Sequence, residues 1–473
     1  WGKAGDLYGR KRVFQLAIVV FLVGSVLCGA AQNMYELIAF RGVQGIGGGG
    51  LISLVFAIIG DVIPPRQRGR YQGYFGAVFG VSSVVGPLLG GFAVDNLSWR
   101  YIFYVNLPLG IAALAVTNRV LRLPARTRQV RIDWWGAVLL VAGVSCILLG
   151  TQSGGTDYPW ASVQIVGLFA VGAVLLGGFV VRERLAPEPI LPLELFRLQI
   201  FTVSNIIAFV SGVAMFGALA FLPQYLQLVH GVSATASGLL LLPLLMGLLV
   251  MSISSGRYIS RTGQYRWFPL AGTALVTTGL VLLTRLGAHT PLPVVGVYIL
   301  VFGAGLGLFM QVLTLVVQNA VPMRLMGVGT SAVTFFRSMG GAIGASALGA
   351  VLTARIATEF VRYVPPADLA HGAKVTQLIQ SPAALNALRH TNPALHEGII
   401  QAYSHAIDTV FLIAVPVSVL SVIAALFIKQ TQLRGSAGPQ TDRPPPVSGS
   451  AARAPTPSST AGVGGATVAG GVV

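Results

Sequence analysis

The sequence predicts an all-α polytopic membrane protein, from its composition, its glycine content and its recurring apolar runs. Of its 473 residues, 54% are hydrophobic and only 10% are charged, and the mean hydropathy is +0.77. Soluble domains carry about 25% charged residues, so this chain lacks the polar surface of a water-facing fold. The 59 glycines follow no fixed period, which excludes a collagen-like chain, and the apolar content excludes a disordered one.

Twelve apolar runs bounded by charged or turn residues are long enough to be membrane spans, each of which needs about 20 apolar residues. We place them at 13–32, 35–59, 71–94, 101–121, 134–151, 162–182, 201–223, 234–255, 268–286, 293–318, 330–354 and 405–428. Most connections are short. The exceptions are the proline-containing segment 183–200, an outer loop expected at 355–404, and a Pro/Ser/Gly/Ala-rich tail at 429–473 that is expected to be disordered.

The basic residues predict the orientation. The net charge is +17, from 31 Lys and Arg against 14 Asp and Glu. If the N-terminal loop is cytoplasmic, most of these basic residues fall in alternate loops on the cytoplasmic side, as the positive-inside rule requires. Both ends of the chain are therefore expected on the cytoplasmic side of a cell membrane. The charge is a topology signal rather than a sign of nucleic-acid binding.

No metal, cofactor or nucleotide site is expected. Cys28 and Cys146 lie in apolar runs, and the six histidines show no metal-ligand spacing, which favours surface histidines over a metal or pH-sensing role. The glycine run from Gly45 to Gly50 follows no predicted strand, and no Lys-Ser/Thr pair follows it. Close helix packing is therefore the better interpretation of this run than a phosphate-binding loop.

The first motif is the glycine-containing basic stretch from Gly2 to Arg12. Gly2 and Gly9 allow a tight turn between helix ends. Asp6 suits a helix N-terminus, and Arg10 suits a helix C-terminus or an acidic partner. The alternative is an ordinary basic loop.

The second motif centres on Arg41, which lies inside a predicted span. A charge there costs about 2.5–3.5 kcal/mol on insertion scales, so it is expected to face a cavity or a partner and to be functional. Gln44 lies one turn away on the same helix face and can share its hydrogen bonds. Arg41 is the strongest single candidate for a functional residue.

The third motif is Gly86-Pro87-Leu88-Leu89-Gly90-Gly91, inside the span 71–94. A proline in mid-span removes a backbone hydrogen bond and bends the helix, and Gly86, Gly90 and Gly91 beside Pro87 allow a neighbouring helix to approach closely. The alternative is a generic kinked packing helix.

Further candidates are polar residues inside spans. Arg337 lies near a span end, where the alternative is that it only extends its charge to the interface. Asp408 lies near the outer end of the last span and is a candidate for coupling. The candidates for a substrate cavity are Asn205, Gln224, Tyr225, Gln227 and Gln311, and for each the alternative is an interhelical hydrogen bond.

These three motifs, in this order, resemble the major facilitator superfamily. The first is similar to its loop motif between spans two and three, the second to its fourth-span motif with a buried arginine, and the third to the fifth-span motif of its exporters, with Ser82 where the family usually has glycine. The stretches Trp99–Gly110 and Thr334–Gly344 are typical of the fourteen-span drug:proton antiporters. The resemblance covers roughly residues 2–428.

The resemblance implies the major facilitator fold, in which two pseudo-symmetric six-helix bundles surround a central cavity. Residues 1–121 would be the remainder of the N-terminal bundle, 122–200 a two-span central insert with linkers, and 201–428 the C-terminal bundle. Because the family's loop motif follows span two, two further spans and a coupling acid are expected upstream, which would make fourteen. The stretch from Gly256 to Gly263 looks like a copy of the loop motif that lacks its acid, as a repeated architecture predicts.

The resemblance also implies a function, which is proton-coupled efflux of small amphipathic or cationic compounds by alternating access. The partners would be a small-molecule substrate, protons and the lipid bilayer, without nucleotide or nucleic acid; the oligomeric state is not predicted. Arg41 and Gln44 would serve proton coupling. Arg10 would pair with Asp61 in a cytoplasmic gate, with Asp6 touching the other bundle; a solvated helix end is the alternative for Asp61.

Two other function classes stay open. A transporter of one defined metabolite, siderophore or peptide would share the fold. A polytopic membrane enzyme would need clustered histidines or acids at one membrane depth, a pattern that the sequence does not show.

Overall fold

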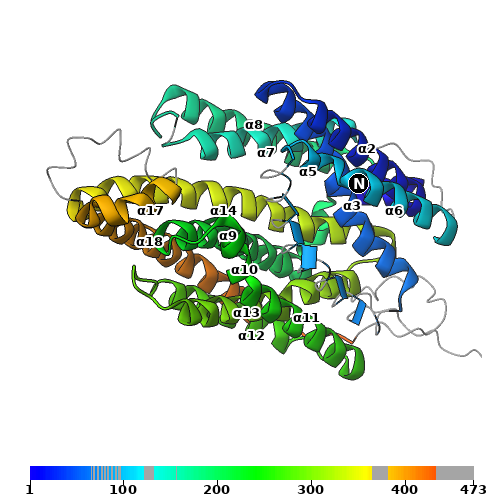
Figure 1. Ribbon diagram of the computed structural model, residues 1–473. Coiled ribbons are helices and arrows are strands. Elements are labelled where there is room, and N and C mark those ends of the chain that lie inside the picture. The colour runs from blue at the N-terminus through cyan, green and yellow to red at the C-terminus, as the bar shows by residue number, and fades with distance from the viewer. Residues whose placement is uncertain are drawn as a thin grey trace, which may run out of the picture. The chain divides into compact units, whose positions relative to one another are not determined.

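The computed structural model describes residues 1–64, 97–121, 133–155, 157–364 and 382–432, together with individual positions between 67 and 93. These residues are almost entirely helical (Figure 1). The first helices are α1 (Gly2–Tyr8), α2 (Arg10–Ala30), α3 (Met34–Val62), α5 (Tyr101–Tyr104), α6 (Asn106–Val120), α7 (Trp134–Ser153) and α8 (Val163–Leu185). They are followed by η1 (Leu193–Arg197), α9 (Gln199–Val229), α10 (Ala234–Leu240), α11 (Leu242–Thr262), α12 (Trp267–Leu283), α13 (Leu292–Ala320), η2 (Met323–Leu325), α14 (Met326–Tyr363), α17 (Pro382–Thr391) and α18 (Pro393–Leu426).

The predicted all-α membrane fold is confirmed. In the described part of the chain, ten helical segments are long and apolar enough to cross a bilayer, and α12, with 17 residues, is a shorter apolar helix. Every predicted span overlaps a helix, except that only individual positions are described in the span 71–94.

The expected outer loop at 355–404 is wrong in part. Helix α14 continues to Tyr363, α17 covers Pro382–Thr391, and α18 already begins at Pro393. The prediction ended this span where charged residues such as Arg355 and Glu359 lower the hydropathy of the sequence. The backbone continues as helix because Ala, Arg and Glu are good helix formers, so α14 leaves the apolar zone without unwinding.

The main core lies among α9, α11, α12, α13, α14 and α18, whose buried apolar side chains form one continuous cluster. In the N-terminal part, α2 packs against α3 and α6, and a smaller cluster joins Val13, Ala17 and Leu54. Helices α7 and α8 lie side by side and contact the rest of the described chain mainly through α14 (Figure 1). A hydrogen bond of 2.9 Å from Ser346 on α14 to Gln152 on α7 supports that contact.

Glycines permit the closest helix contacts. On the α9–α14 seam, a Cβ added to Gly340 would collide with the backbone carbonyl of Phe209, so only glycine fits there. In the glycine run of α3, Gly47 and Gly50 pack against α2, as the packing interpretation requires, whereas Gly45 and Gly49 face open space.

Candidate functional site

The first motif folds as a short helix, a break and a long helix. Helix α1 ends at Gly9, whose φ of 91° is a backbone conformation that favours glycine, and α2 begins at Arg10. The turn is therefore confined to Gly9, and the rest of the expected loop is helical. This break aims the Arg10 side chain into the protein, where only 7% of it is exposed.

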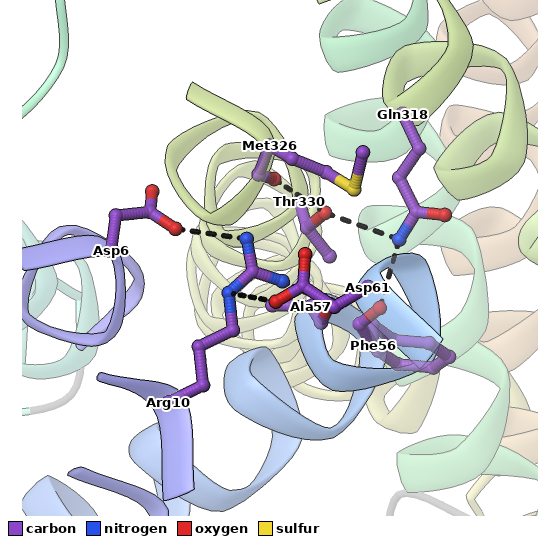
Figure 2. A network of polar contacts seen from close by, with 8 residues as sticks. All are labelled: Asp6, Arg10, Phe56, Ala57, Asp61, Gln318, Met326 and Thr330. Carbon is purple, nitrogen blue, oxygen red and sulfur yellow. Dashed lines mark hydrogen bonds and ion pairs between the residues drawn. The ribbon is translucent and has the colours of Figure 1, made fainter. Parts of the chain in front are cut away.

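Arg10 contacts two carboxylates and a backbone carbonyl (Figure 2). Its Nη2 donates to Asp6 Oδ1 at 2.9 Å, its Nε lies 2.9 Å from Asp61 Oδ2 at the end of α3, and its Nη1 donates to the carbonyl of Ala57. The planar guanidinium, with five N–H donors, is suited to such a multiple contact. Residues Asp6, Arg10 and Asp61 are called the Arg10 cluster below.

Asp6 of the Arg10 cluster also lies against the first turn of α14. A Cβ added to Gly327 would lie 2.6 Å from both carboxylate oxygens of Asp6, and one added to Gly2 would lie 2.5 Å from the carbonyl oxygen of Gly327. Burial raises the pKa of Asp6 to about 6; the Arg10 guanidinium opposes this rise, the Asp61 carboxylate adds to it, and the Val328 amide opposes it.

Gln318 forms a second polar link beside the Arg10 cluster, and sequence reasoning missed it. Its Nε2 donates to the carbonyl of Phe56 on α3 at 2.9 Å and to Thr330 Oγ1 on α14 at 3.3 Å (Figure 2). Gln318 is completely buried at the end of α13. In the sequence, the one feature that could have pointed to Gln318 is its polar amide at the end of an apolar run. Together, the two links join α1, α2 and α3 to α13 and α14 at one end of the helices.

Arg41 heads a hydrogen-bonded chain that crosses three helices. Its Nη1 donates to Gln44 Oε1 at 2.7 Å, and Gln44 Nε2 donates to Ser25 Oγ on α2 at 2.7 Å. Asn106 on α6 donates to the same Ser25 oxygen at 3.5 Å. The Arg41 guanidinium carbon lies 5.8 Å from the ring centre of Phe103, while Gln44 is buried. This chain connects a charge on an exposed side of α3 to the buried helix interface.

Of the third motif, the structure describes Gly86 and Gly90. No described atom lies within 4 Å of a Cβ added at Gly86 or Gly90. Pro87 and Gly91 lie outside the described residues, so the predicted bend is not described either.

The cavity candidates separate into two groups. Gln224 accepts from the Tyr403 hydroxyl, and Tyr225 donates to the carbonyl of Gly287, both at 2.8 Å. Gln224 therefore follows the alternative of interhelical bonding, as does Gln227 through its bond to Ser237, whereas Tyr225 binds the loop after α12. Asn205 Oδ1 and Gln311 Oε1 are buried and accept no hydrogen bond from the described residues.

The two in-span charges lie apart from the Arg10 cluster. Arg337 is half-buried in α14, and its side chain makes no hydrogen bond or ion pair with the described residues. Asp408 on α18 lines a cavity of about 400 Å³ near the far end of α14. Thus, among the described residues, the structure joins Asp6, Arg10 and Asp61, and separately Arg41 and Gln44.

Comparisons with known proteins agree with this fold. The proton:xylose symporter XylE is 12% identical with a TM-score of 0.51, and the alignment covers 88% of this chain and 80% of that structure, a likeness that concerns the fold alone. The multidrug transporter protein MdtP of Bacillus subtilis is 39% identical over 85% of this chain and 73% of its own length.

Two uncharacterized MFS-type transporters of Mycobacterium tuberculosis are 43% identical over 91% of this chain. The chain spans only 62% of the length of these two relatives. Residues 1–345 match the family model described as the Major Facilitator Superfamily. Because this match covers well over half of the sequence, the chain belongs to the Major Facilitator Superfamily.

Proposed function

We propose that the chain is a proton-coupled exporter of small amphipathic or cationic compounds that works by alternating access, like the fourteen-span drug:proton antiporters. The observation that carries this proposal is the Arg10 cluster. Beside it, polar contacts cross from the N-terminal to the C-terminal part between Asp6 and the Val328 amide and between Gln318 and Phe56. A few polar contacts at one end are the arrangement expected of a gate that closes and reopens. The multidrug transporter named among its relatives supports the substrate class.

The gate residues have separate roles in this proposal. Gly2 lets α1 approach α14, Gly9 makes the turn, and Arg10 binds Asp6 and Asp61. Because burial in the closed arrangement raises the pKa of Asp6, proton binding to Asp6 favours this arrangement, and opening of this end favours proton release. We place this end and both chain termini on the cytoplasmic side of the cell membrane, because the positive-inside rule puts the loops rich in Lys and Arg there.

Proton coupling is assigned to the chain of hydrogen bonds headed by Arg41 and Gln44. A fixed positive charge within a span favours the deprotonated form of a nearby acid and so makes proton release easier. Asn205 and Gln311 are the better candidates for substrate contact, because each has a buried oxygen with free hydrogen-bonding capacity among the described residues. Gly86, Pro87, Gly90 and Gly91 are proposed as the antiporter helix motif.

The test is ethidium efflux from bacteria that lack their main exporters and produce this protein. We expect cells with an intact proton gradient to export ethidium and a protonophore to stop that export. Cells that carry the empty vector are the control. Export that continues after the proton gradient has collapsed would contradict proton coupling.

A further inference from the structure

A cavity of about 400 Å³ lies between the C-terminal ends of α12 and α14 and the middle of α18, and the proposed transport mechanism does not use it. Its lining includes two carboxylates (Glu359, Asp408), two other ionisable groups (Arg362, His405), the ring of Tyr363 and the apolar Leu412. Helix α14 has 38 residues and begins beside Asp6, so at 1.5 Å per residue the cavity lies about 50 Å from the Arg10 cluster.

Asp408 leaves hydrogen-bonding capacity unused in this cavity. Its Oδ1 is buried and accepts no hydrogen bond from any described residue. Its Oδ2 lies 3.9 Å from His405 Nδ1, which is too long for a hydrogen bond. A buried carboxylate oxygen without a donor is costly, so a ligand that supplies N–H groups would be stabilised here.

Among the described residues, the other lining groups donate no hydrogen bond to the Asp408 Oδ1 atom. Glu359 makes no hydrogen bond or ion pair with the described residues. The Arg362 guanidinium carbon lies 5.5 Å from the ring centre of Tyr363. His405 stacks on the same Tyr363 ring, with the ring centroids 5.1 Å apart and an angle of 13° between the rings. The Tyr363 ring is therefore already covered by Arg362 and His405, and the groups left for a ligand cation are the Glu359 and Asp408 carboxylates.

We propose that this cavity binds a primary ammonium group. Such a group supplies both the positive charge and the three N–H donors that the two carboxylates lack. A quaternary ammonium would bring the charge without the donors. A metal ion is less suitable, because no group of three His, Cys, Asp or Glu side chains among the described residues has the geometry to hold one.

The position of the cavity indicates where such a group comes from. Asp408 lies where the apolar run of α18 begins, and Leu412, one turn further, is 58% exposed. The cavity thus lies at the boundary of the apolar zone, at the depth of lipid headgroups. Ethanolamine phospholipids carry a primary ammonium there, with a phosphate that Arg362 on the rim can bind; free ethanolamine offers the same ammonium from solution.

The experiment measures binding by the purified protein in detergent. It is titrated with short-chain phosphatidylethanolamine, with short-chain phosphatidylcholine and with ethanolamine, and binding is followed by calorimetry. We expect the ethanolamine lipid to bind at least tenfold more tightly than the choline lipid, and we expect Asp408→Asn and Glu359→Gln each to weaken it at least tenfold. Glu397→Gln, which removes another carboxylate of α18 that does not line the cavity, is the control and should leave binding unchanged.

Each outcome decides the proposal. Binding of the ethanolamine lipid alone identifies a lipid site, and comparable binding of free ethanolamine identifies a site for soluble amines; both support the proposal. Equal binding of the two lipids, absence of binding, or unchanged binding by both cavity variants would overturn it. The melting temperature of each variant shows whether it is folded. The proposal does not depend on export, because no transport step enters the measurement.

Discussion

At the scale of single residues, Arg10 is the centre of the Arg10 cluster and its most buried charge. It lies between two carboxylates and is 7% exposed, while Asp6 is 11% and Asp61 34% exposed. Breaking a buried ion pair by removing one partner costs about 3–5 kcal/mol, because the other charge is left uncompensated. Removal of the Arg10 side chain is therefore expected to leave the buried Asp6 carboxylate without a compensating charge.

Asp6 gives the protein a dependence of stability on pH. Folding raises the pKa of Asp6 from 3.8 to about 6, because burial disfavours its charged form. The stabilisation is fully present below about pH 3.8 and is lost as the pH rises through about 6. We predict that the wild-type protein loses melting temperature relative to Asp6→Asn over this window, measured in detergent at fixed salt. A difference between the two proteins that stays constant across the window would contradict the assignment.

The sequence predicted these residues unequally well. Arg10, Asp61 and Gln44 were named from motif spacing and resemblance, because charges and amides in an apolar chain are easy to recognise. Gln318 was missed because one amide at the end of an apolar run looks the same whether it faces water or another helix. The free oxygen of Asp408 was also beyond sequence reasoning, since it depends on which helix ends meet.

At the scale of helices, the α9–α14 seam depends on glycine. A Cβ at Gly340 would collide with the carbonyl of Phe209, whereas one at Gly349 would meet only Phe221 Cζ at 3.9 Å. We predict that Gly340→Ala lowers the melting temperature, because two backbones must move apart. The matched control Gly349→Ala should keep or raise the melting temperature, since alanine favours helix by about 1 kcal/mol over glycine. Equal effects of the two substitutions would argue against a glycine-dependent seam.

The loop between α11 and α12 is held by the segment that follows α18. Gly263 has a φ of 72°, as Gly9 has a positive φ in the first motif. Gln430 accepts from the backbone N–H groups of Tyr265 and Arg266 at 3.2 and 3.0 Å, and its Nε2 donates to the carbonyl of Gly263 at 2.9 Å. Thus the copy of the loop motif, which lacks an acid, is fixed by an amide rather than by an ion pair.

This contact predicts a difference between two shortened chains. A chain that ends after Gln432 keeps Gln430 and Thr431, which bind the α11–α12 loop, whereas one that ends after Ile428 loses both. We predict a lower melting temperature for the shorter chain, and a similar loss for Gln430→Ala in the uncut protein. The first shortened chain is the control for the second. Equal stability of the two shortened chains would show that the segment does not hold the loop.

Helix ends were harder to predict from sequence than helices. Apolar runs located the spans, because the bilayer requires about 20 apolar residues whatever their order. The ends of α14 and α18 were misplaced because helix propensity and neighbouring helices, rather than hydropathy, decide where a helix stops outside the apolar zone.

At the scale of the whole described unit, apolar side chains and polar contacts have different places in the structure. Trp134 and Trp135 at the start of α7 are each 71% exposed, and Val174 on α8 is 74% exposed, as helices that face lipid require. At the end that carries the Arg10 cluster, Gln318 bonds to the carbonyl of Phe56 and Asp6 bonds to the Val328 amide, which links the N-terminal and C-terminal parts. Apolar packing therefore holds each part together, while a few polar groups at one end link the two parts.

The most direct test of the account is ethidium transport into proteoliposomes driven by an imposed pH gradient. The wild-type protein and Arg12→Ala, which removes an exposed arginine at the start of α2, are predicted to accumulate ethidium when the gradient is present. Arg41→Ala is predicted to lose gradient-driven accumulation at least tenfold while inserting into the membrane in normal amount. Accumulation by Arg41→Ala equal to that of the wild-type protein would contradict the account.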